Sequence, residues 1–517
     1  ALLLAGCGGG GETSSSSKPT SSSTGTSQIS TGDPYGNGNL VKENTSQRQI
    51  ALPAGASLVD TYVATYTADM YTFDYLNTYH ATDSEILVNL VDGLIEHDTY
   101  GILRPMIAEA VYANDDQSEF TFKIKKGIKW VTSDGTVYPQ DVRAQDFVTG
   151  MQHLLDAQGG LEYIVTSANL VNAQAYMDGE VPFSQVGVKA VDDYTLVYSL
   201  SESTPYFLST MEYNPYMPMN KDFFVSQGCG LGVDEWKDSA TTCKYGVTGE
   251  PDSILYNGAY LMTNYTSSSI IQMSANPHYQ HADDVKTKTI TFLFEDGSNP
   301  DAMLTAFKNG QYSAVGVSNT ILERARSEFV GKLYTVDTNA TTFYGTWNLN
   351  RKKYETGSVK SVKTESQKAD TRAAILNKNF RKAVNSAFDK ASWNAVSVGN
   401  DLKLNSLRNS LTHPEFVSIS EAYGGYAAGT MFGEIVASEI KKLDPSWSGS
   451  TDDQVNGWYD ISAAKAFAAA AKAELQGKVT FPIHIDVVYY SASVTQDGQV
   501  KSFKQAIEAA LGSDFIV

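Results

Sequence analysis

The chain has 517 residues, of which 42% are hydrophobic, and its 58 acidic and 39 basic side chains give a formal net charge of −19. This length exceeds what one hydrophobic core usually serves, so we expect two or three domains. The acidic balance disfavours binding to nucleic acid or to anionic lipid headgroups, because both would be repelled. Three cysteines in a chain of this length exclude a disulfide-dense scaffold.

The first seven residues, ALLLAGC, form a short apolar segment. They resemble the end of a signal peptide with a lipobox, whose processing leaves an N-terminal cysteine for acylation, so Cys7 is the predicted lipid anchor. Seven residues are too few to cross a bilayer, which takes about 20. The alternative is an artificial apolar extension with a chance cysteine. Residues 8–48 are rich in Gly, Ser and Thr and poor in apolar side chains, which predicts a flexible tether.

The first folded elements are expected soon after the tether. Residues 58–69 favour a strand, and Asp83 is a predicted N-cap for a helix whose apolar residues continue to Leu94. Glu119 to Lys126 alternate between apolar and polar side chains, which is the period of a half-buried strand. The later segments predict a turn at 133–136, a helix from 141, a hairpin over 186–200, strands over 286–294, 341–350 and 479–490, helices over 303–310, 379–388, 462–475 and 500–511, and the start of a strand at 514–517.

Several of these elements carry recognisable short motifs in a fixed order. Gly127-Ile128-Lys129-Trp130, Asp134-Gly135 and Asp146-Phe147 follow the alternating strand, and Phe388-Asp389-Lys390 lies much further on. The constellation resembles the signature of the peptide/nickel-binding family of ABC-transporter solute-binding proteins, and it is similar to Gram-positive oligopeptide-binding lipoproteins. The resemblance implies an α/β fold of the periplasmic-binding-protein type, with two hinged lobes, mixed sheets and an extra subdomain.

The resemblance also implies a division of the chain. Residues 49–81 and 206–339 would form the core of the first lobe, 82–205 an inserted smaller subdomain, and 340–517 the second lobe. Because family members continue past this point, we expect the second lobe to be incomplete here.

No catalytic motif emerges from the sequence, so we predict a protein that is not an enzyme and that needs no cofactor. His278 and His281 are three residues apart, but Pro277 and the polar residues around them indicate a loop, and we predict no metal site. Cys229 and Cys243 flank a Gly- and Asp-rich loop. In an oxidising compartment they would form a local disulfide, and the alternative is a pair of free thiols.

Aromatic residues gather in two runs, from Tyr62 to Tyr79 and from Phe343 to Trp347. Each run fits either a sheet core or the wall of a binding cleft. By the resemblance, Asp69 falls near the sequence position of an acidic cleft residue in family members, whose carboxylate faces the ammonium group of the ligand. The predicted peptide-binding residues are Asp69, Tyr71, Asn319, Tyr344, Trp347 and Asn348.

The resemblance implies a function as well. We expect a monomeric extracytoplasmic protein, anchored to the outer face of a Gram-positive cell membrane, that captures oligopeptides between its lobes and delivers them to an ABC permease. Alternatives within the family are a carrier of nickel, haem or sugar and a receptor for peptide pheromones. Outside the family, a surface adhesin or an extracellular hydrolase remains open.

Overall fold

The structure is a computed structural model in which residues 54–98, 103–335, 342–355, 357, 361–491 and 493–517 are described. Cys7, the apolar segment 1–7 and the tether 8–48 lie outside these residues. The described chain forms two compact units, an N-terminal unit that ends at Glu295 and a C-terminal unit from Asp296 to Val517. The subdomain boundaries expected at residues 82, 206 and 340 stay predictions.

Two four-stranded sheets organise the N-terminal unit. In the first, of order β1-β12-β11-β10, β1 runs parallel to β12 and the other pairs are antiparallel, so the sheet is mixed. The second, of order β4-β5-β9-β8, is antiparallel throughout. Two short antiparallel pairs, β2-β3 and β6-β7, complete the set. The strands are β1 Thr61–Tyr66, β2 Ile95–His97, β3 Leu103–Pro105, β4 Ala108–Ala113, β5 Glu119–Ile124, β6 Lys129–Val131, β7 Val137–Asp141, β8 Val188–Asp192, β9 Thr195–Ser199, β10 Tyr260–Thr266, β11 Ile270–Ala275 and β12 Thr289–Phe294.

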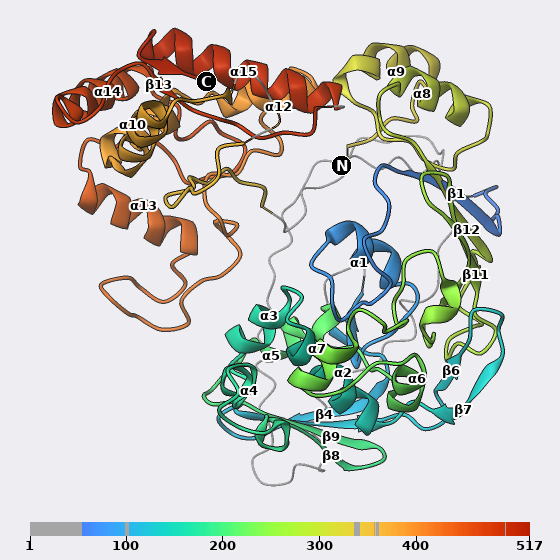
Figure 1. Cartoon of the computed structure of the whole chain (residues 1–517). Coiled ribbons are helices and arrows are strands. Elements are labelled where there is room, and N and C mark those ends of the chain that lie inside the picture. Colours follow the sequence, from blue (N-terminus) through green and yellow to red (C-terminus); the bar gives the residue numbers. More distant parts are fainter. Residues whose placement is uncertain (1–53, 99–102, 336–341, 356, 358–360, 492) are drawn as a thin grey trace. The chain divides into compact units, whose positions relative to one another are not determined.

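Helix α2 covers one face of the second sheet, where it contacts β8 and β9 (Figure 1). Its apolar side chains Phe147, Met151, Leu154 and Leu155 recur at helical spacing and are all buried, as the sequence predicts. They belong to a single apolar core that runs through the whole N-terminal unit. The helices of this unit are α1 Ala81–Leu87, α2 Ala144–Ala157, α3 Glu162–Ser167, α4 Ala173–Met177, α5 Phe207–Thr210, α6 Lys221–Ser226 and α7 Val233–Ser239, with short 3-10 turns η2 Phe183–Gln185, η3 Asn214–Tyr216 and η4 Pro251–Ser253.

Two predicted tight turns are confirmed, and aspartate forms both. In the β8–β9 hairpin, Asp192 accepts a hydrogen bond from the backbone N–H of Tyr194 at 2.8 Å. In the β6–β7 turn, Asp134 accepts one from the N–H of Thr136 at 3.0 Å, and Gly135 has a φ of +86°. In both turns an aspartate accepts a hydrogen bond from the backbone two residues on, and at Asp134 a glycine follows it, so the sequence alone reveals the mechanism of each turn.

The C-terminal unit is mainly helical. Helix α11 packs on α14 and α15 around a buried cluster that includes Phe380, Ala468 and Ile507. Beside it, β13 and β14 form a short parallel pair, which confirms the strand expected at residues 514–517. The elements are α8 Pro300–Lys308, η5 Asn319–Ile321, α9 Leu322–Glu328, α10 Glu365–Leu376, α11 Lys378–Ala387, α12 Lys390–Val398, α13 Phe432–Leu443, α14 Ile461–Leu475, β13 Ile483–His484, α15 Val494–Leu511 and β14 Phe515–Ile516. Within the described ranges, no helix combines the length and the apolar character that a membrane span requires.

Two strand predictions in this unit are wrong. Residues 342–350 contain no strand, and Phe343 and Tyr344 are 89% and 69% exposed instead of lying in a sheet core. The strand expected over 479–490 shrinks to the two residues of β13. A β-rich composition makes a strand only where a second strand pairs with it. No described strand pairs with 342–350, and β14 pairs with β13 alone.

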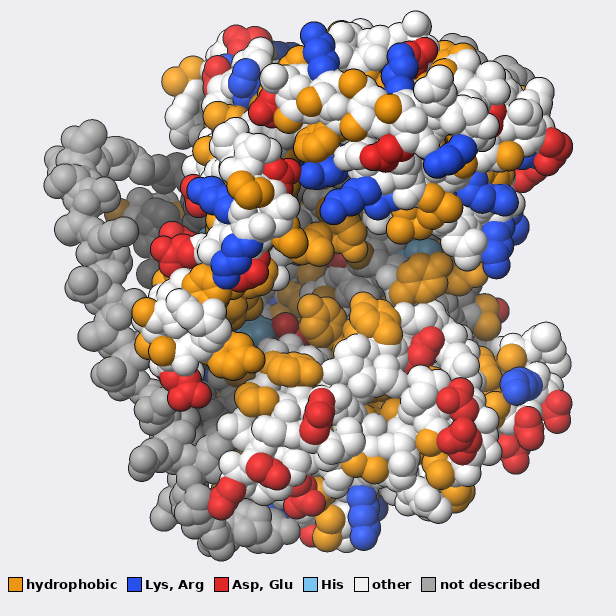
Figure 2. Space-filling model, turned by 90° about the vertical axis from the view of Figure 1, so that its left-hand side faces the viewer, with side chains coloured by type: hydrophobic (Ala, Val, Ile, Leu, Met, Phe, Trp, Pro, Cys, Tyr) orange, Lys and Arg blue, Asp and Glu red, His pale blue; other side chains and the backbone are white. Residues whose placement is uncertain are grey.

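Charge is divided unevenly between the two units. Residues 54–295 hold 12 Lys and Arg against 32 Asp and Glu, a net charge of −20, whereas residues 296–517 hold 24 against 23, a net charge of +1. On the face shown in Figure 2, red carboxylate side chains predominate over blue ones in the lower part of the view, where the N-terminal unit is drawn. The acidity of the chain therefore belongs to the N-terminal unit.

Candidate functional site

The segment that follows β1 carries the first predicted site residue, Asp69. Its carboxylate accepts hydrogen bonds from the backbone N–H of Ser268 at 2.7 Å, from the hydroxyls of Ser267 and Ser268, and from the hydroxyl of Tyr66 at 3.2 Å. Burial raises the pKa of Asp69, but these hydrogen bonds outweigh burial and hold the pKa below its ordinary value. Asp69 thereby ties the end of β1 to the turn between β10 and β11. Its contact with a ligand ammonium group stays a prediction.

The predicted role of Asp83 as an N-cap is wrong. His80 occupies that position, and Asp83 lies buried in the first turn of α1. Its carboxylate accepts hydrogen bonds from the backbone N–H groups of Tyr71 at 2.9 Å and Thr72 at 3.3 Å, and from the hydroxyl of Thr78 at 2.8 Å. A buried carboxylate requires donors of this kind, because they replace the water it has lost. Asp83 therefore fixes both ends of the loop from Tyr71 to Thr78.

The aromatic run in this loop divides between core and surface. Phe73 and Tyr75 are buried, whereas Tyr71 and Tyr79 are 73% and 65% exposed. The ring of His80, the residue after Tyr79, contacts both, with ring centroids 4.8 Å from Tyr71 and 4.4 Å from Tyr79. The interplanar angles of 38° and 25° make these contacts tilted to stacked. These three residues, called the aromatic stack below, form an exposed π surface held on a rigid loop.

A glycine pair at the end of α2 makes room for this loop. A Cβ atom on Gly160 would lie 2.8 Å from Cδ1 of Tyr79, and one on Gly159 would lie 2.0 Å from the side-chain oxygen of Asn77. Gly160 also has a φ of +104°, a conformation that other residues rarely adopt. Its N–H donates to the carboxylate of Glu162 at 2.8 Å. The stack and Glu162 are therefore brought together by a backbone that only glycine fits.

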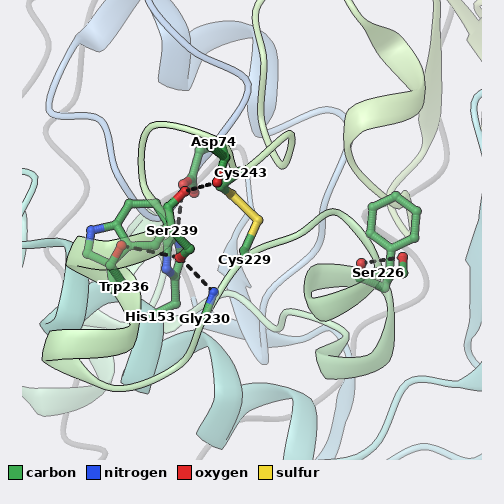
Figure 3. Close-up of a disulfide and its surroundings, with 10 residues drawn as sticks. Asp74, His153, Ser226, Cys229, Gly230, Trp236, Ser239 and Cys243 are labelled. Atoms are coloured by element: carbon green, nitrogen blue, oxygen red, sulfur yellow. Dashed lines mark hydrogen bonds and ion pairs between the residues drawn. A yellow bond between two sulfur atoms is a disulfide. The ribbon is translucent and has the colours of Figure 1, made fainter.

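A buried hydrogen bond between Asp74 and His153 and a disulfide support the same loop from within (Figure 3). Nε2 of His153, on α2, lies 2.7 Å from Oδ2 of Asp74, and both side chains are buried. Cys229 and Cys243 are joined by a disulfide, so the predicted bridge is confirmed and the alternative of free thiols is wrong. The loop that this bridge closes contains α7, and its Trp236 ring packs 4.8 Å from the ring of His153. The disulfide loop thus covers the Asp74–His153 pair.

The loop closed by the disulfide is also bonded to α2, through the buried carboxylate of Asp156. Asp156 accepts hydrogen bonds from the N–H of Gly232 at 2.6 Å and from the hydroxyl of Tyr176. Burial raises the pKa of Asp156 above its ordinary value, against the lowering effect of these two bonds. Gly230 donates its N–H to the hydroxyl of Ser239 at 2.8 Å across the same loop.

The motif residues of the predicted family signature have a structural role. The indole N–H of Trp130, which is fully buried, donates to Oδ2 of Asp146 at 2.8 Å, and the backbone N–H of Arg143 donates to the same oxygen at 3.1 Å. Burial raises the pKa of Asp146 to about 7, although both hydrogen bonds lower it. The pair joins β6 to the start of α2.

The other predicted site residues lie in the C-terminal unit. The indole N–H of Trp347 donates to the side-chain oxygen of Asn385 at 3.3 Å, and its ring makes an edge contact with Phe380 of the core. Tyr344 and Asn348, on either side, are exposed. Asn319 begins η5, where its side-chain oxygen lies near Gly399 at the end of α12. Tyr344, Trp347 and Asn348 thus share one segment, Asn319 lies on another, and their roles in binding stay predictions.

Metal ligation finds little support in the described part of the chain. There, no group of three or more His, Cys, Asp or Glu side chains could hold a metal ion. His278 and His281 lie in a series of turns after β11, as the predicted loop implies.

Sequence reasoning missed three parts of this site. The predicted peptide-binding residues include Tyr71 but neither Tyr79 nor His80, because the exposure of these two depends on the loop and not on periodicity. Sequence reasoning predicted Asp83 as an N-cap, although a carboxylate three and four residues before Ile86 and Leu87 already lies on an apolar face. It found neither partner of the Asp74–His153 pair, which joins residues 79 apart in the sequence.

The chain resembles known proteins in sequence. The model of bacterial extracellular solute-binding proteins, family 5 Middle, matches residues 103–515. The chain is 35% identical over 462 residues to the oligopeptide-binding protein AliB of Streptococcus pneumoniae, covering 88% of this chain and 67% of AliB. It is 32% identical over 479 residues to the oligopeptide-binding protein SarA of Streptococcus gordonii, covering 92% of this chain and 68% of SarA. The chain therefore spans about two thirds of the length of these relatives.

A solved structure agrees at the level of the fold. The substrate-binding domain of an oligopeptide ABC transporter from Bacillus anthracis superposes with a TM-score of 0.66 at 22% identity, over 89% of this chain and 74% of that domain. The predicted two-lobed α/β fold with mixed sheets is thereby confirmed. The chain belongs to the bacterial extracellular solute-binding proteins of family 5.

Proposed function

We propose that this chain captures oligopeptides outside the cytoplasm and delivers them to an ABC permease. The observation that carries the proposal is the identity of 32–35% to AliB and SarA, both oligopeptide-binding proteins by name, over 88–92% of this chain. Capture requires no bond to be made or broken, so the protein acts as a carrier and not as an enzyme.

The physical logic is recognition of the peptide main chain. An extended peptide offers N–H and C=O groups at regular spacing whatever its sequence, and hydrogen bonds to them give affinity without selecting side chains. Ordered water adapts side-chain pockets to different residues. A dissociation constant near 1 μM corresponds to about −8 kcal/mol, which is tight enough for capture and weak enough for release.

The predicted site residues supply suitable groups for this role. Tyr71 and Tyr344 present exposed rings, and Asn319 and Asn348 present exposed amide groups. In this proposal they contact peptide side chains and main chain, Trp347 stiffens the segment between Tyr344 and Asn348, and the two lobes close on the ligand by a hinge motion. Ligand shifts the population toward the closed form because it touches both lobes only there.

The location follows from the family and from the N-terminal sequence. Family 5 comprises extracellular solute-binding proteins of bacteria, and the named relatives come from Gram-positive streptococci. We infer that Cys7 is acylated and that residues 8–48 hold the folded units away from the outer face of the cell membrane. More than one acyl chain would make such an anchor stable. The partners in this proposal are the peptide, the permease and the membrane, and the protein is a monomer.

Calorimetry with the full-length protein and a defined library of peptides of 4 to 12 residues tests the proposal. We expect heat of binding with many members, and mass spectrometry of the recovered peptides should find them intact. Nickel, haem and sugars serve as separate titrations. Binding of one of these without any binding of peptide would reject the proposal, and so would cleavage of the peptides by the purified protein.

A further inference from the structure

The aromatic stack lies in an unusually acidic part of the chain. Residues 54–98, which carry the stack, contain eight Asp and Glu and no Lys or Arg, and residues 144–188, which contact it through Gly160, contain five and none. Both segments belong to the unit whose net charge is −20. The electrostatic potential at the stack is therefore negative over a range of about a Debye length, roughly 8–10 Å at physiological salt.

Four of the carboxylates on these two segments fall into two groups. Asp69 and Asp83 are saturated by hydrogen bonds from the chain, as described above. Glu162 accepts one bond from Gly160, which itself adjoins Tyr79, and Glu85 is exposed on α1. Neither Glu85 nor Glu162 forms a salt bridge with a described residue. Both retain the capacity to attract a cation that comes from outside the chain.

The stack itself is a surface for cations. The face of an aromatic ring attracts an ammonium or guanidinium group within about 6 Å of its centroid. The effect amounts to about two- to fivefold in affinity at exposed sites and up to roughly thirtyfold when the contact is desolvated, at tenfold per 1.4 kcal/mol. Tyr71 and Tyr79 offer such faces to solvent, and the hydrogen bonds of Asp83 already fix the loop that carries them, so little entropy is lost on binding.

We propose that the Tyr71–His80–Tyr79 stack is the docking site for a Lys or Arg side chain of the bound peptide, and that the protein selects cationic peptides through it. The proposal rests on the function proposed above and adds the substrate class. Charge complementarity determines the occupant: the surrounding segments repel an acidic side chain, and a neutral side chain gains nothing from the negative potential.

The experiment compares three hexapeptides that differ at one position, which is Lys, the neutral isostere norleucine, or Glu. Calorimetry on the full-length protein at 0.15 M NaCl should give the Lys peptide at least fivefold tighter binding than the norleucine peptide, and the Glu peptide the weakest binding. At 0.5 M NaCl the advantage of Lys should shrink without vanishing, because salt screens the long-range potential more than the direct ring contact.

Variants then assign the preference to the stack. Tyr71→Leu with Tyr79→Leu keeps apolar side chains but removes both ring faces, and the ratio of Lys to norleucine affinity should fall below twofold. Tyr71→Phe with Tyr79→Phe keeps the rings and should retain most of the ratio. Tyr423→Leu removes a tyrosine that is 80% exposed in the C-terminal unit and should leave the ratio unchanged. Circular dichroism checks that each variant is folded.

The outcomes separate this proposal from the one on which it rests. If no peptide binds, peptide capture itself fails. If Lys, norleucine and Glu peptides bind alike, capture stands and the cationic preference is rejected. If the preference persists in the double leucine variant, it comes from the overall charge of the unit, and the assignment to the stack is rejected. If the phenylalanine variant loses the preference as fully as the leucine variant, the hydroxyl groups carry it and the ring-face argument is overturned.

Discussion

Removing the disulfide should destabilise the N-terminal unit by an amount that its loop length sets. Cys229 and Cys243 are 14 residues apart in the sequence. In the chain-entropy account, a closed loop of about 15 residues contributes about 3 kcal/mol, because the bridge limits the unfolded chain. Cys229 is buried, so alanine is a better replacement than serine, whose hydroxyl would need a partner there.

The double variant Cys229→Ala, Cys243→Ala should therefore lose about 3 kcal/mol of unfolding free energy. With a urea m value of about 2–3 kcal/mol/M, its transition should move down by roughly 1–1.5 M. Unfolding is followed by tryptophan fluorescence and by far-UV circular dichroism, because the two units need not unfold together. Trp236 lies inside the closed loop and reports on it directly.

Dithiothreitol supplies the matched control. Reduction of the wild-type protein should reproduce the shift, and the same treatment should leave the alanine variant unchanged. A shift below about 0.3 M would show that packing of α7 against α2 holds the loop without the bridge. An equal response of both proteins to the reductant would show that the effect does not arise from this disulfide at all.

Three further predictions follow from buried or crowded groups. Gly160→Ala should cost about 1–3 kcal/mol of unfolding free energy, measured by urea titration, because its Cβ would lie 2.8 Å from the Tyr79 ring at a φ of +104°. The pKa of Asp146 is raised to about 7, so the native state binds more protons than the unfolded state between about pH 4 and 7, and stability should fall by up to about 1.4 kcal/mol per pH unit as pH rises through that window. Urea midpoints from pH 4.5 to 7.5 should show this slope, and Asp146→Asn should flatten it. Asp486→Asn should cost about 3–5 kcal/mol by the same urea assay, because Lys363, whose ammonium lies 2.6 Å from Asp486, is buried and would lose its carboxylate; an unchanged midpoint would contradict that pairing.

Much of the scaffold could be predicted because its signals are local. The aspartate turns at Asp134 and Asp192 need only their own neighbours, and the stripe of α2 needs only helical periodicity. The same holds for the disulfide, since a separation of 14 residues across a polar loop brings both cysteines within reach. In these three cases the residues that form the feature are close in the sequence, and the prediction and the structure agree.

The failures depend on how the chain folds around a residue, which composition and periodicity do not show. Residues 341–350 have the composition of a strand, but strand formation depends on a partner elsewhere in the chain, and the described residues 342–350 have none. Asp83 has the residue type and position of an N-cap, but the donors that bind it belong to a loop that precedes the helix. In both cases a tertiary contact outweighs local propensity: the strand lacks a partner, and Asp83 bonds a folded loop only 5 to 12 residues before it, whose shape no periodicity reveals.

The residues that identify the family differ from the residues proposed to contact the ligand, so family membership alone does not determine which peptides a member binds. The motif residues that reveal the family, Trp130 and Asp146, bond to each other inside the fold, so selection for the fold alone would keep them. Tyr71 and Tyr79, in contrast, are exposed and make few contacts that stability would preserve, so they are free to vary among chains that share the scaffold. Two members with the same signature can then bind different peptides, and the residues of the loop after β1 are where their preferences should diverge.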